Sequence, residues 1–218
     1  AVKQGVRNID LSSVKNVLVV FGDTPLLSTK TLGNLININN KNDITVLGFK
    51  TNNPGRYGRL LIKDSKLLKI VEALDANEDE QKITLCNGGI MIIKADRLKD
   101  NLNLLKSNNA KKEFILSDLI EINNNTGGVS SFLECDYEET IGIDSKKGLS
   151  KAEKIFQNKL RNKFMEAGTT ILDPETVFFS HDTIIGKDVE IGSNIVFGEN
   201  VLIKDNVVIK SFCSIENS

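Results

Sequence analysis

Val17-Leu18-Val19-Val20-Phe21-Gly22-Asp23 is a run of five apolar residues that ends in a glycine and a carboxylate. Four of the five are β-branched or aromatic, which is typical of a strand buried on both faces in the middle of a parallel sheet. Asp23 would then lie at the carboxyl end of that strand, the edge where open α/β sheets bind ligands. This segment alone leaves open whether Asp23 binds a ligand or is a solvated turn or helix-cap residue.

The segments after Asp23 predict a sheet with crossover helices. A helix is expected to begin at Ser28, and Ile44 to Phe49 has the apolar character of the next strand. This β-α-β order, with a crossover of about twenty residues, predicts a parallel sheet of the doubly wound kind. The other predicted elements are a short helix and loop over 1–16, a hairpin over 60–72, strands over 83–93 and 129–134, and helices over 98–105 and 113–122. The strand over 83–93 is expected to bend at Asn87-Gly88-Gly89.

The sequence changes character from Ser145 onward. Ser150 and Glu153 fit a capping box, apolar residues then recur every three or four positions, and Gly168 fits the end of a helix. This pattern predicts one long amphipathic helix that links two unlike domains.

Beyond this helix, apolar residues recur every six positions, a period that predicts a β-solenoid in which each hexad forms one flat side of a coil. A β-meander with the same spacing is the alternative. The first row contains Ile185, Ile191, Phe197, Ile203, Ile209 and Ile215, and the second contains Val189, Ile195, Val201, Val207 and Cys213. The predicted fold class is α/β: a truncated doubly wound domain over 1–144, a linker helix over 145–168, and the start of a left-handed parallel β-helix over 169–218.

Composition narrows the classes of function. The chain of 218 residues carries 28 basic and 29 acidic residues, without a long run of one sign, which argues against nucleic acid and anionic membranes as partners. No apolar run approaches the roughly 18 residues of a membrane span, and no signal-peptide pattern opens the chain. The three scattered cysteines fit reduced thiols in a cytoplasmic protein. His181 is the only histidine, which excludes a His-rich zinc site, and a surface-loop position is its simpler interpretation.

The order of these parts resembles the bacterial bifunctional UDP-N-acetylglucosamine pyrophosphorylase/glucosamine-1-phosphate N-acetyltransferases. The similarity extends over nearly the whole chain, and no single motif carries it. The matching stretches are Val17–Leu27, Gly55–Leu60 (GRYGRL), Ile70–Ala76 (IVEALDA), Asn87–Ile90 (NGGI), Asn108–Leu119 (NNAKKEFILSDL), Gly142–Ser145 (GIDS) and Gly168–Thr176 (GTTILDPET).

The resemblance implies a Mg²⁺-dependent uridylyltransferase that forms UDP-N-acetylglucosamine and pyrophosphate from UTP and N-acetylglucosamine 1-phosphate. The parent enzyme also acetylates glucosamine 1-phosphate from acetyl-CoA, and both reactions supply precursors of peptidoglycan and lipopolysaccharide. A cytoplasmic homotrimer, assembled through the β-helix, is implied as well. Because the sugar phosphate oxygen attacks the α-phosphorus of UTP, the protein's task is positioning and charge neutralisation.

The same resemblance assigns the site residues. It makes Asp23 a ligand of Mg²⁺, and it places Asp144 where the family has a second ligand, an asparagine; oxygen ligands of this kind suit the ion. Glu72 would accept a hydrogen bond from a sugar hydroxyl. The full set of predicted substrate-binding residues is Phe21, Gly22, Asp23, Gly58, Glu72, Asn87 and Asp144.

The chain also departs from the family pattern. The family's glycine-rich LAAGxGTRM loop, with the lysine and arginine that hold the triphosphate, is absent, so we expect weak or no activity in the first reaction. Leu74 replaces a common basic residue, and the hexads stop before the acetyltransferase site. Since the chain begins at Ala1 and its last coil is uncovered, we expect a fragment. The alternatives are another sugar-1-phosphate nucleotidyltransferase with a hexapeptide tail, or a non-catalytic trimerising remnant.

Overall fold

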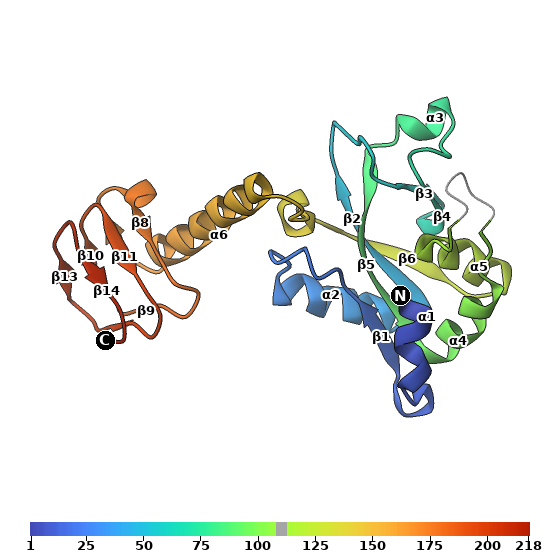
Figure 1. Cartoon of the computed structure of the whole chain (residues 1–218), viewed down its shortest axis with the longest axis horizontal. Helices are drawn as coiled ribbons and strands as arrows, with labels where there is room; N and C mark the ends of the chain where they lie inside the picture. Colours follow the sequence, from blue (N-terminus) through green and yellow to red (C-terminus); the bar gives the residue numbers. More distant parts are fainter. Residues whose placement is uncertain (108–112) are drawn as a thin grey trace. The chain divides into compact units, whose positions relative to one another are not determined.

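The computed structural model describes residues 1–107 and 113–218 (Figure 1). It divides into two compact units, Ala1–Gly142 and Ile143–Ser218. The predicted domain boundaries, at 144/145 and 168/169, remain predictions. Part of the family motif at Asn108–Leu119 lies outside the described residues.

The described residues of the first unit form a six-stranded mixed sheet with the order β4-β3-β5-β2-β6, and β1 pairs with β5. β2 and β6 are parallel, whereas β5 runs antiparallel to β1, β2 and β3. The predicted crossover is confirmed, because β1 and β2 run in the same direction on either side of β5. The sheet itself is mixed and not purely parallel. Its strands are β1 Asn16–Val19, β2 Ile44–Lys50, β3 Arg59–Lys63, β4 Lys66–Val71, β5 Leu85–Lys94 and β6 Ser130–Cys135.

Strand β1 contradicts the prediction of a strand buried on both faces. Among the described residues it pairs only with β5, from Asn16↔Lys94 to Val19↔Met91. Val20 is 48% exposed and Phe21 is 51% exposed. The strand buried on both faces is β2, whose residues from Ile44 to Phe49 are all buried. Apolar content predicted a strand correctly in each case, but burial depends on neighbours that a local pattern does not contain.

Helices cover both faces of this sheet (Figure 1). Leu35 of α2 packs with Leu47, whereas Leu98 of α4 and Leu119 of α5 pack with Ile44 on the opposite face. Since Ile44 and Leu47 are an odd number of residues apart on β2, their side chains point to opposite faces. The helices are α1 Val2–Gly5, α2 Thr29–Asn39, α3 Glu78–Gln81, α4 Ala95–Leu104 and α5 Leu119–Asn125, with 3₁₀ turns at Val6–Asn8, Leu11–Ser13, Leu116–Asp118 and Tyr137–Thr140.

The predictions of individual helices and turns agree with the structure to different degrees. The hairpin is confirmed: Asp64 and Ser65 both have positive φ, as a two-residue type I′ turn requires. Ser28 caps α2 as predicted, because its hydroxyl accepts a hydrogen bond from the Thr31 N–H at 3.1 Å. The helix predicted over 113–122 begins late, since Ile115 is extended and α5 starts only at Leu119 after a 3₁₀ turn.

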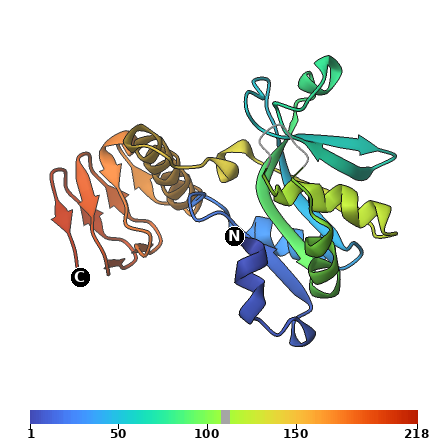
Figure 2. The same ribbon diagram turned by 45° about the vertical axis from the view of Figure 1, so that its right-hand side comes forward.

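The second unit contains a coil of short parallel strands, confirming the predicted solenoid (Figure 2). Stacked strands are paired at Val177↔Ile195 and at Ile184↔Leu202, so one coil consists of three hexads. Both predicted six-residue rows face the core of the coil. The strands are β7 Thr170–Ile171, β8 Val177–Phe178, β9 Ile184–Ile185, β10 Glu190–Ile191, β11 Ile195–Phe197, β12 Leu202–Ile203, β13 Val208–Ile209 and β14 Ser214–Ile215.

The corners of the coil also follow the six-residue period. The left-handed conformation, with φ between +53° and +66°, recurs at five positions along it. Asparagine and aspartate tolerate this conformation better than other non-glycine residues do, and four of the five positions carry them. The five are Asp188, Asn194, Asn200, Asn206 and Phe212.

Helix α6, Lys146–Glu166, packs on this coil within the second unit. It begins one turn before the predicted capping box, because the Ser145 hydroxyl accepts a hydrogen bond from the Gly148 N–H at 3.1 Å. Its C-terminus is as predicted, with Gly168 at φ +100°. The buried Gln157 side chain donates a hydrogen bond to the Phe179 carbonyl and accepts one from the Phe179 N–H, each at 2.8 Å. It thus satisfies both backbone groups, as the backbone of a neighbouring strand would.

Replacing Gln157 by leucine should lower the free energy of unfolding of the second unit by about 2–4 kcal/mol. The substitution leaves the N–H and C=O of Phe179 without partners in a buried position, which costs about 1–3 kcal/mol for each group. Chemical denaturation monitored by circular dichroism measures the change. The control is Lys154→Leu, an exposed position on the same helix. Equal stability of the two variants would contradict the role assigned to Gln157.

Candidate functional site

Asp23 follows β1 at the sheet edge and is exposed. The Thr24 hydroxyl donates a hydrogen bond to the carbonyl of Phe21 at 3.0 Å, which closes the turn that presents Asp23. A Cβ at Gly142 would lie 3.3 Å from the Asp23 Oδ2, so the glycine leaves room beside the carboxylate. Within 1–107 and 113–218, no group donates a hydrogen bond or forms an ion pair with this carboxylate. Its oxygens are therefore available to a cation.

Those oxygens suit Mg²⁺, which takes one or two protein carboxylates and completes its coordination with water and phosphate. No group of three or more His, Cys, Asp or Glu side chains that could hold a metal ion occurs in the part of the chain that the structure describes. Asp144, the second predicted ligand, is exposed and belongs to the other unit, just before the cap of α6. The pairing of Asp144 with Asp23 around one ion stays a prediction.

The structure brings the three predicted sugar-binding residues together. Gly58 precedes β3, Glu72 follows β4 and Asn87 lies on β5. The Asn87 N–H donates a hydrogen bond to the Gly58 carbonyl at 2.8 Å. A Cβ at Gly58 would lie 3.5 Å from the Glu72 Oε1 and 3.6 Å from the Asn87 Cβ. A carboxylate, a side-chain amide and the buried backbone of a glycine thus lie next to one another.

Phe21 connects this group to the strand end that carries Asp23. A Cβ at Gly89 would overlap the ring of Phe21, so the ring lies directly on this glycine of β5, two residues after Asn87. Gly89 has φ +76°, a conformation that also favours glycine. Gly22, the remaining predicted residue, has no heavy atom within 4 Å of a Cβ built on it, and the backbone there is accessible.

Gly58→Ala should weaken binding of a sugar phosphate about 10-fold, because misplacement of binding groups by less than 1 Å is costly. The new Cβ would lie 2.9 Å from Ile70 Cγ2, so either the Ile70 side chain or residue 58 must shift, next to Glu72 and Asn87. Gly33→Ala on α2, where nothing lies within 4 Å of the Cβ, is the control. Calorimetric titration of both variants measures the change, and unchanged affinity in Gly58→Ala would show that this backbone does not contact the ligand.

Two residues around this site were missed in the sequence, although both lie within the motifs that match the family. Arg59 is 4% exposed, and its guanidinium donates hydrogen bonds to the carbonyls of Tyr57 and Gly55, in the turn just before Gly58. Ser117 is 4% exposed, and its hydroxyl donates a hydrogen bond to Glu72. Arg59 and Ser117 are polar residues in buried positions, which no local pattern distinguishes from exposed ones.

The surroundings of the site are aromatic on one side and acidic on the other. The Tyr57 ring meets Phe49 edge-on at 4.8 Å, and burial, with a hydrogen bond to Tyr137, raises the pKa of Tyr57 to about 12. Burial, followed by the charges of Glu72, Glu121 and Asp75, raises the pKa of Asp118. Leu74, which replaces the basic residue expected from the resemblance, is 73% exposed and carries no positive charge.

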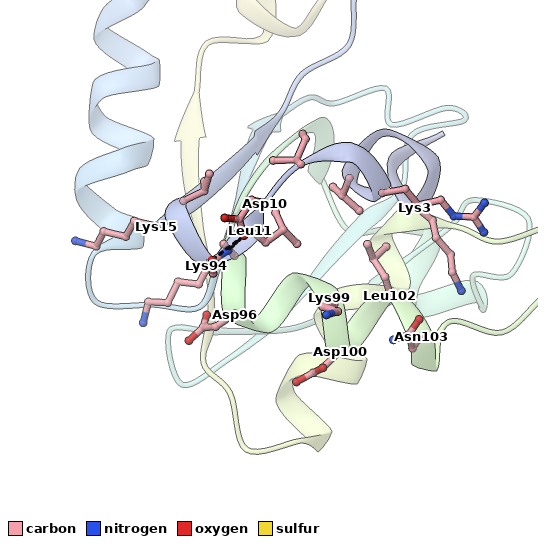
Figure 3. Close-up of a pocket in the computed structure, with 16 residues that line it drawn as sticks. Lys3, Asp10, Leu11, Lys15, Lys94, Asp96, Lys99, Asp100, Leu102 and Asn103 are labelled. Atoms are coloured by element: carbon pink, nitrogen blue, oxygen red, sulfur yellow. Dashed lines mark hydrogen bonds between the residues drawn. The ribbon is translucent and has the colours of Figure 1, made fainter.

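A separate cavity of about 980 Å³ lies between the N-terminal segment and α4 (Figure 3). It is lined by both signs of charge, including Lys3, Lys99, Asp96 and Asp100, over an apolar floor that contains Leu11 and Leu102. None of the seven predicted site residues lines it. None of the described helices is long and apolar enough to cross a membrane.

Two solved structures share the fold of this chain. A CMP:2-keto-3-deoxy-manno-octonic acid synthetase in complex with CTP has a TM-score of 0.54 at 14% identity, over 72% of this chain and 67% of the synthetase. A nucleoside-diphosphate-sugar pyrophosphorylase from Vibrio cholerae RC9 has a TM-score of 0.50 at 11% identity, over 69% of this chain and 62% of that protein. These similarities concern the fold, and they confirm the predicted nucleotidyltransferase-like architecture.

Sequence comparison is more specific. The family described as "Bacterial transferase hexapeptide (six repeats)" matches residues 182–217. The bifunctional protein GlmU of Roseobacter denitrificans is 41% identical over 172 residues, which are 79% of this chain and 38% of the relative. The GlmU of Rhodopseudomonas palustris strain TIE-1 is 42% identical over 174 residues, with the same coverage. The chain thus matches little more than a third of the length of these relatives. The predicted resemblance is confirmed, and the chain is GlmU-like over most of its own length.

Proposed function

We propose that the first unit carries the sugar and metal half of a uridylyltransferase site, which joins UTP and N-acetylglucosamine 1-phosphate into UDP-N-acetylglucosamine. The observation that carries the proposal is the convergence of Gly58, Glu72 and Asn87 at one point. These residues come from three separate elements, and together they place a carboxylate and a side-chain amide beside one another. The GlmU relatives and the nucleotidyltransferase-like fold support the same reaction class.

The site's own residues supply positioning. The Glu72 carboxylate accepts a hydrogen bond from a sugar hydroxyl, the Asn87 amide contacts the same sugar, and the backbone at Gly58 approaches it closely because no side chain intervenes. The attacking oxygen of a sugar phosphate is already anionic, so the step needs no general base. The main requirement is to hold two anions together, which positioning and charge neutralisation achieve.

Mg²⁺, held by Asp23 and Asp144, would neutralise charge on the phosphates of both substrates. Because Asp144 takes the place of the family's asparagine, we propose that it increases the negative charge around the ion and binds metal at least as tightly. By the resemblance, the remaining triphosphate contacts would come from a glycine-rich loop, a pattern that does not occur in these 218 residues. We therefore propose that this chain binds the sugar phosphate and uses UTP slowly or not at all.

For the second unit we propose association into a homotrimer. The outward positions of its flat sides carry apolar side chains that are about half exposed, among them Ile184 at 58%, Leu202 at 54% and Val208 at 52%. Apolar sheet faces of this kind are typical of surfaces that are covered on assembly. Acetyl-CoA and glucosamine 1-phosphate are proposed as substrates of a complete parent enzyme, and the cytoplasm is its proposed location.

Calorimetric titration of the 218-residue chain tests the uridylyltransferase proposal. N-Acetylglucosamine 1-phosphate should bind in the presence of Mg²⁺, and glucose 1-phosphate should bind more weakly. Glu72→Ala should weaken binding of N-acetylglucosamine 1-phosphate, because it removes the acceptor for a sugar hydroxyl, whereas Glu121→Ala, which alters a carboxylate outside the predicted set, should not. If the wild-type chain binds neither sugar phosphate and still forms trimers in analytical ultracentrifugation, the non-catalytic remnant becomes the better description.

A further inference from the structure

The Ser117 side chain lies beside the carboxylate that we propose as the sugar ligand. Ser117 belongs to the 3₁₀ turn Leu116–Asp118, 45 residues away from Glu72 along the chain. Its hydroxyl donates a hydrogen bond of 2.9 Å to the Glu72 Oε1. The residue is only 4% exposed, so this hydroxyl is directed into the protein and not into solvent. The resemblance assigns no role to this serine.

The hydrogen bond from Ser117 reaches only one of the two carboxylate oxygens of Glu72. Oε1 lies between the Ser117 hydroxyl and Gly58, where an added Cβ would be 3.5 Å away. Oε2 has no hydrogen-bond partner in the described ranges. One oxygen is therefore anchored by the protein, and the other is left to accept a hydrogen bond from a ligand.

An anchor matters at this position because, in the ranges that the structure describes, Ser117 is the one residue that holds the carboxylate with a hydrogen bond. Glu72 follows the last residue of β4, and the charged groups around the adjacent Asp118 are the carboxylates of Glu72, Glu121 and Asp75. Like charges repel, so these neighbours favour conformations in which Glu72 turns away from them. A glutamate side chain also loses rotamer freedom when a ligand orders it. A neutral donor that fixes Oε1 in the free protein removes that cost from binding.

We infer that Ser117 is a positioning residue, which orients Glu72 so that its second oxygen receives the hydroxyl of the sugar. This inference rests on the proposed function and adds to it a hydrogen-bond donor from a different element. Ser117 acts through Glu72 in this account and needs no contact with the ligand itself.

Three variants of the 218-residue chain test the inference, with N-acetylglucosamine 1-phosphate and Mg²⁺ as the probe in calorimetric titrations. Ser117→Ala should weaken binding about 10-fold, the effect of losing one hydrogen bond to a charged group. Ser117→Thr keeps the hydroxyl and should restore binding to within about 2-fold of the wild-type chain. Ser130→Ala is the matched control, since Ser130 is a buried serine with one hydrogen bond, to Asn123, away from the predicted site.

Chemical unfolding of the same variants separates positioning from stability. Ser117→Ala and Ser130→Ala should destabilise the first unit to a similar extent, while only Ser117→Ala loses affinity. Equal affinity of Ser117→Ala and the wild-type chain, equal losses in Ser117→Ala and Ser130→Ala, or no restoration by Ser117→Thr would each overturn the inference and leave the proposed function intact. Absence of binding by the wild-type chain would overturn both.

Discussion

Asp23→Ala is expected to slow uridylyl transfer by roughly 10²–10³-fold or more in a longer chain that also carries the family's glycine-rich loop, by analogy with the loss of one hydrogen-bond donor that stabilises charge in a transition state. The exposed Asp23 carboxylate has no partner among the residues that the structure describes, so its removal sacrifices no structural hydrogen bond there. The loss should therefore appear in the metal-dependent rate and not in stability. Release of pyrophosphate, followed at a series of Mg²⁺ concentrations, measures it.

Asp100→Ala is the control for this experiment, because Asp100 is an exposed aspartate on α4 and belongs to the same unit. It should leave both the rate and the metal dependence unchanged. Asp23→Asn keeps an oxygen ligand but removes the charge, so its rate should lie between those of the wild-type protein and Asp23→Ala. A wild-type rate in Asp23→Ala would show that Asp23 does not hold the ion.

Phe179→Ala should destabilise the second unit by about 3–5 kcal/mol, the usual cost of truncating a buried phenylalanine. The Phe179 ring is 3% exposed. It lies 4.7 Å from the ring of Phe164 on α6 and stacks on Phe197 of the next coil at 5.0 Å. Truncation would leave a cavity between α6 and two coils. The strands of the coils are only two or three residues long, so few neighbouring side chains could move to fill this cavity.

The neighbouring Phe178, the last residue of β8, provides the control, since it is 45% exposed. Phe178→Ala loses a contact with the Arg161 guanidinium, which lies 5.4 Å from the ring, and should cost no more than about 1 kcal/mol. Thermal denaturation of both variants compares the loss of the buried ring with the loss of the exposed one. Similar losses would mean that the stacked rings do not form the core of this unit.

The solenoid was predicted from the sequence most completely, because each hexad contacts equivalent hexads directly above and below it. The positions of Ile191 and Ile209 follow from spacing alone, and their pairing in the structure agrees with that spacing. The first unit has no such repeat. Val17–Phe21 and Ile44–Phe49 look alike as sequences, but only the second is enclosed by strands and helices on all sides. That difference arises from topology, which a local pattern does not encode.

The candidate site was likewise only partly predictable from local sequence patterns. Glu72 and Asn87 were predicted from motifs, and the structure explains their proximity through the pairing of β3 with β4 and β5. Arg59 and Ser117 lie in two other stretches that match the family, Gly55–Leu60 and Asn108–Leu119, but they were not predicted, because their importance depends on which atoms they contact. A serine that donates to a carboxylate 45 residues away has no signature in its own neighbourhood.

The contact between α6 and the first coil has a consequence for self-association. Parallel coils that end in an unpaired strand can accept a strand from another molecule and so grow into fibres. At β8 that edge is occupied: Arg161 donates a hydrogen bond to the Val177 carbonyl at 2.9 Å, and Gln157 pairs with the backbone of Phe179, the residue after the strand. A second molecule cannot add a strand there without displacing the helix. The two ends of the stack of coils therefore differ, because another molecule cannot add a strand at the edge that α6 covers.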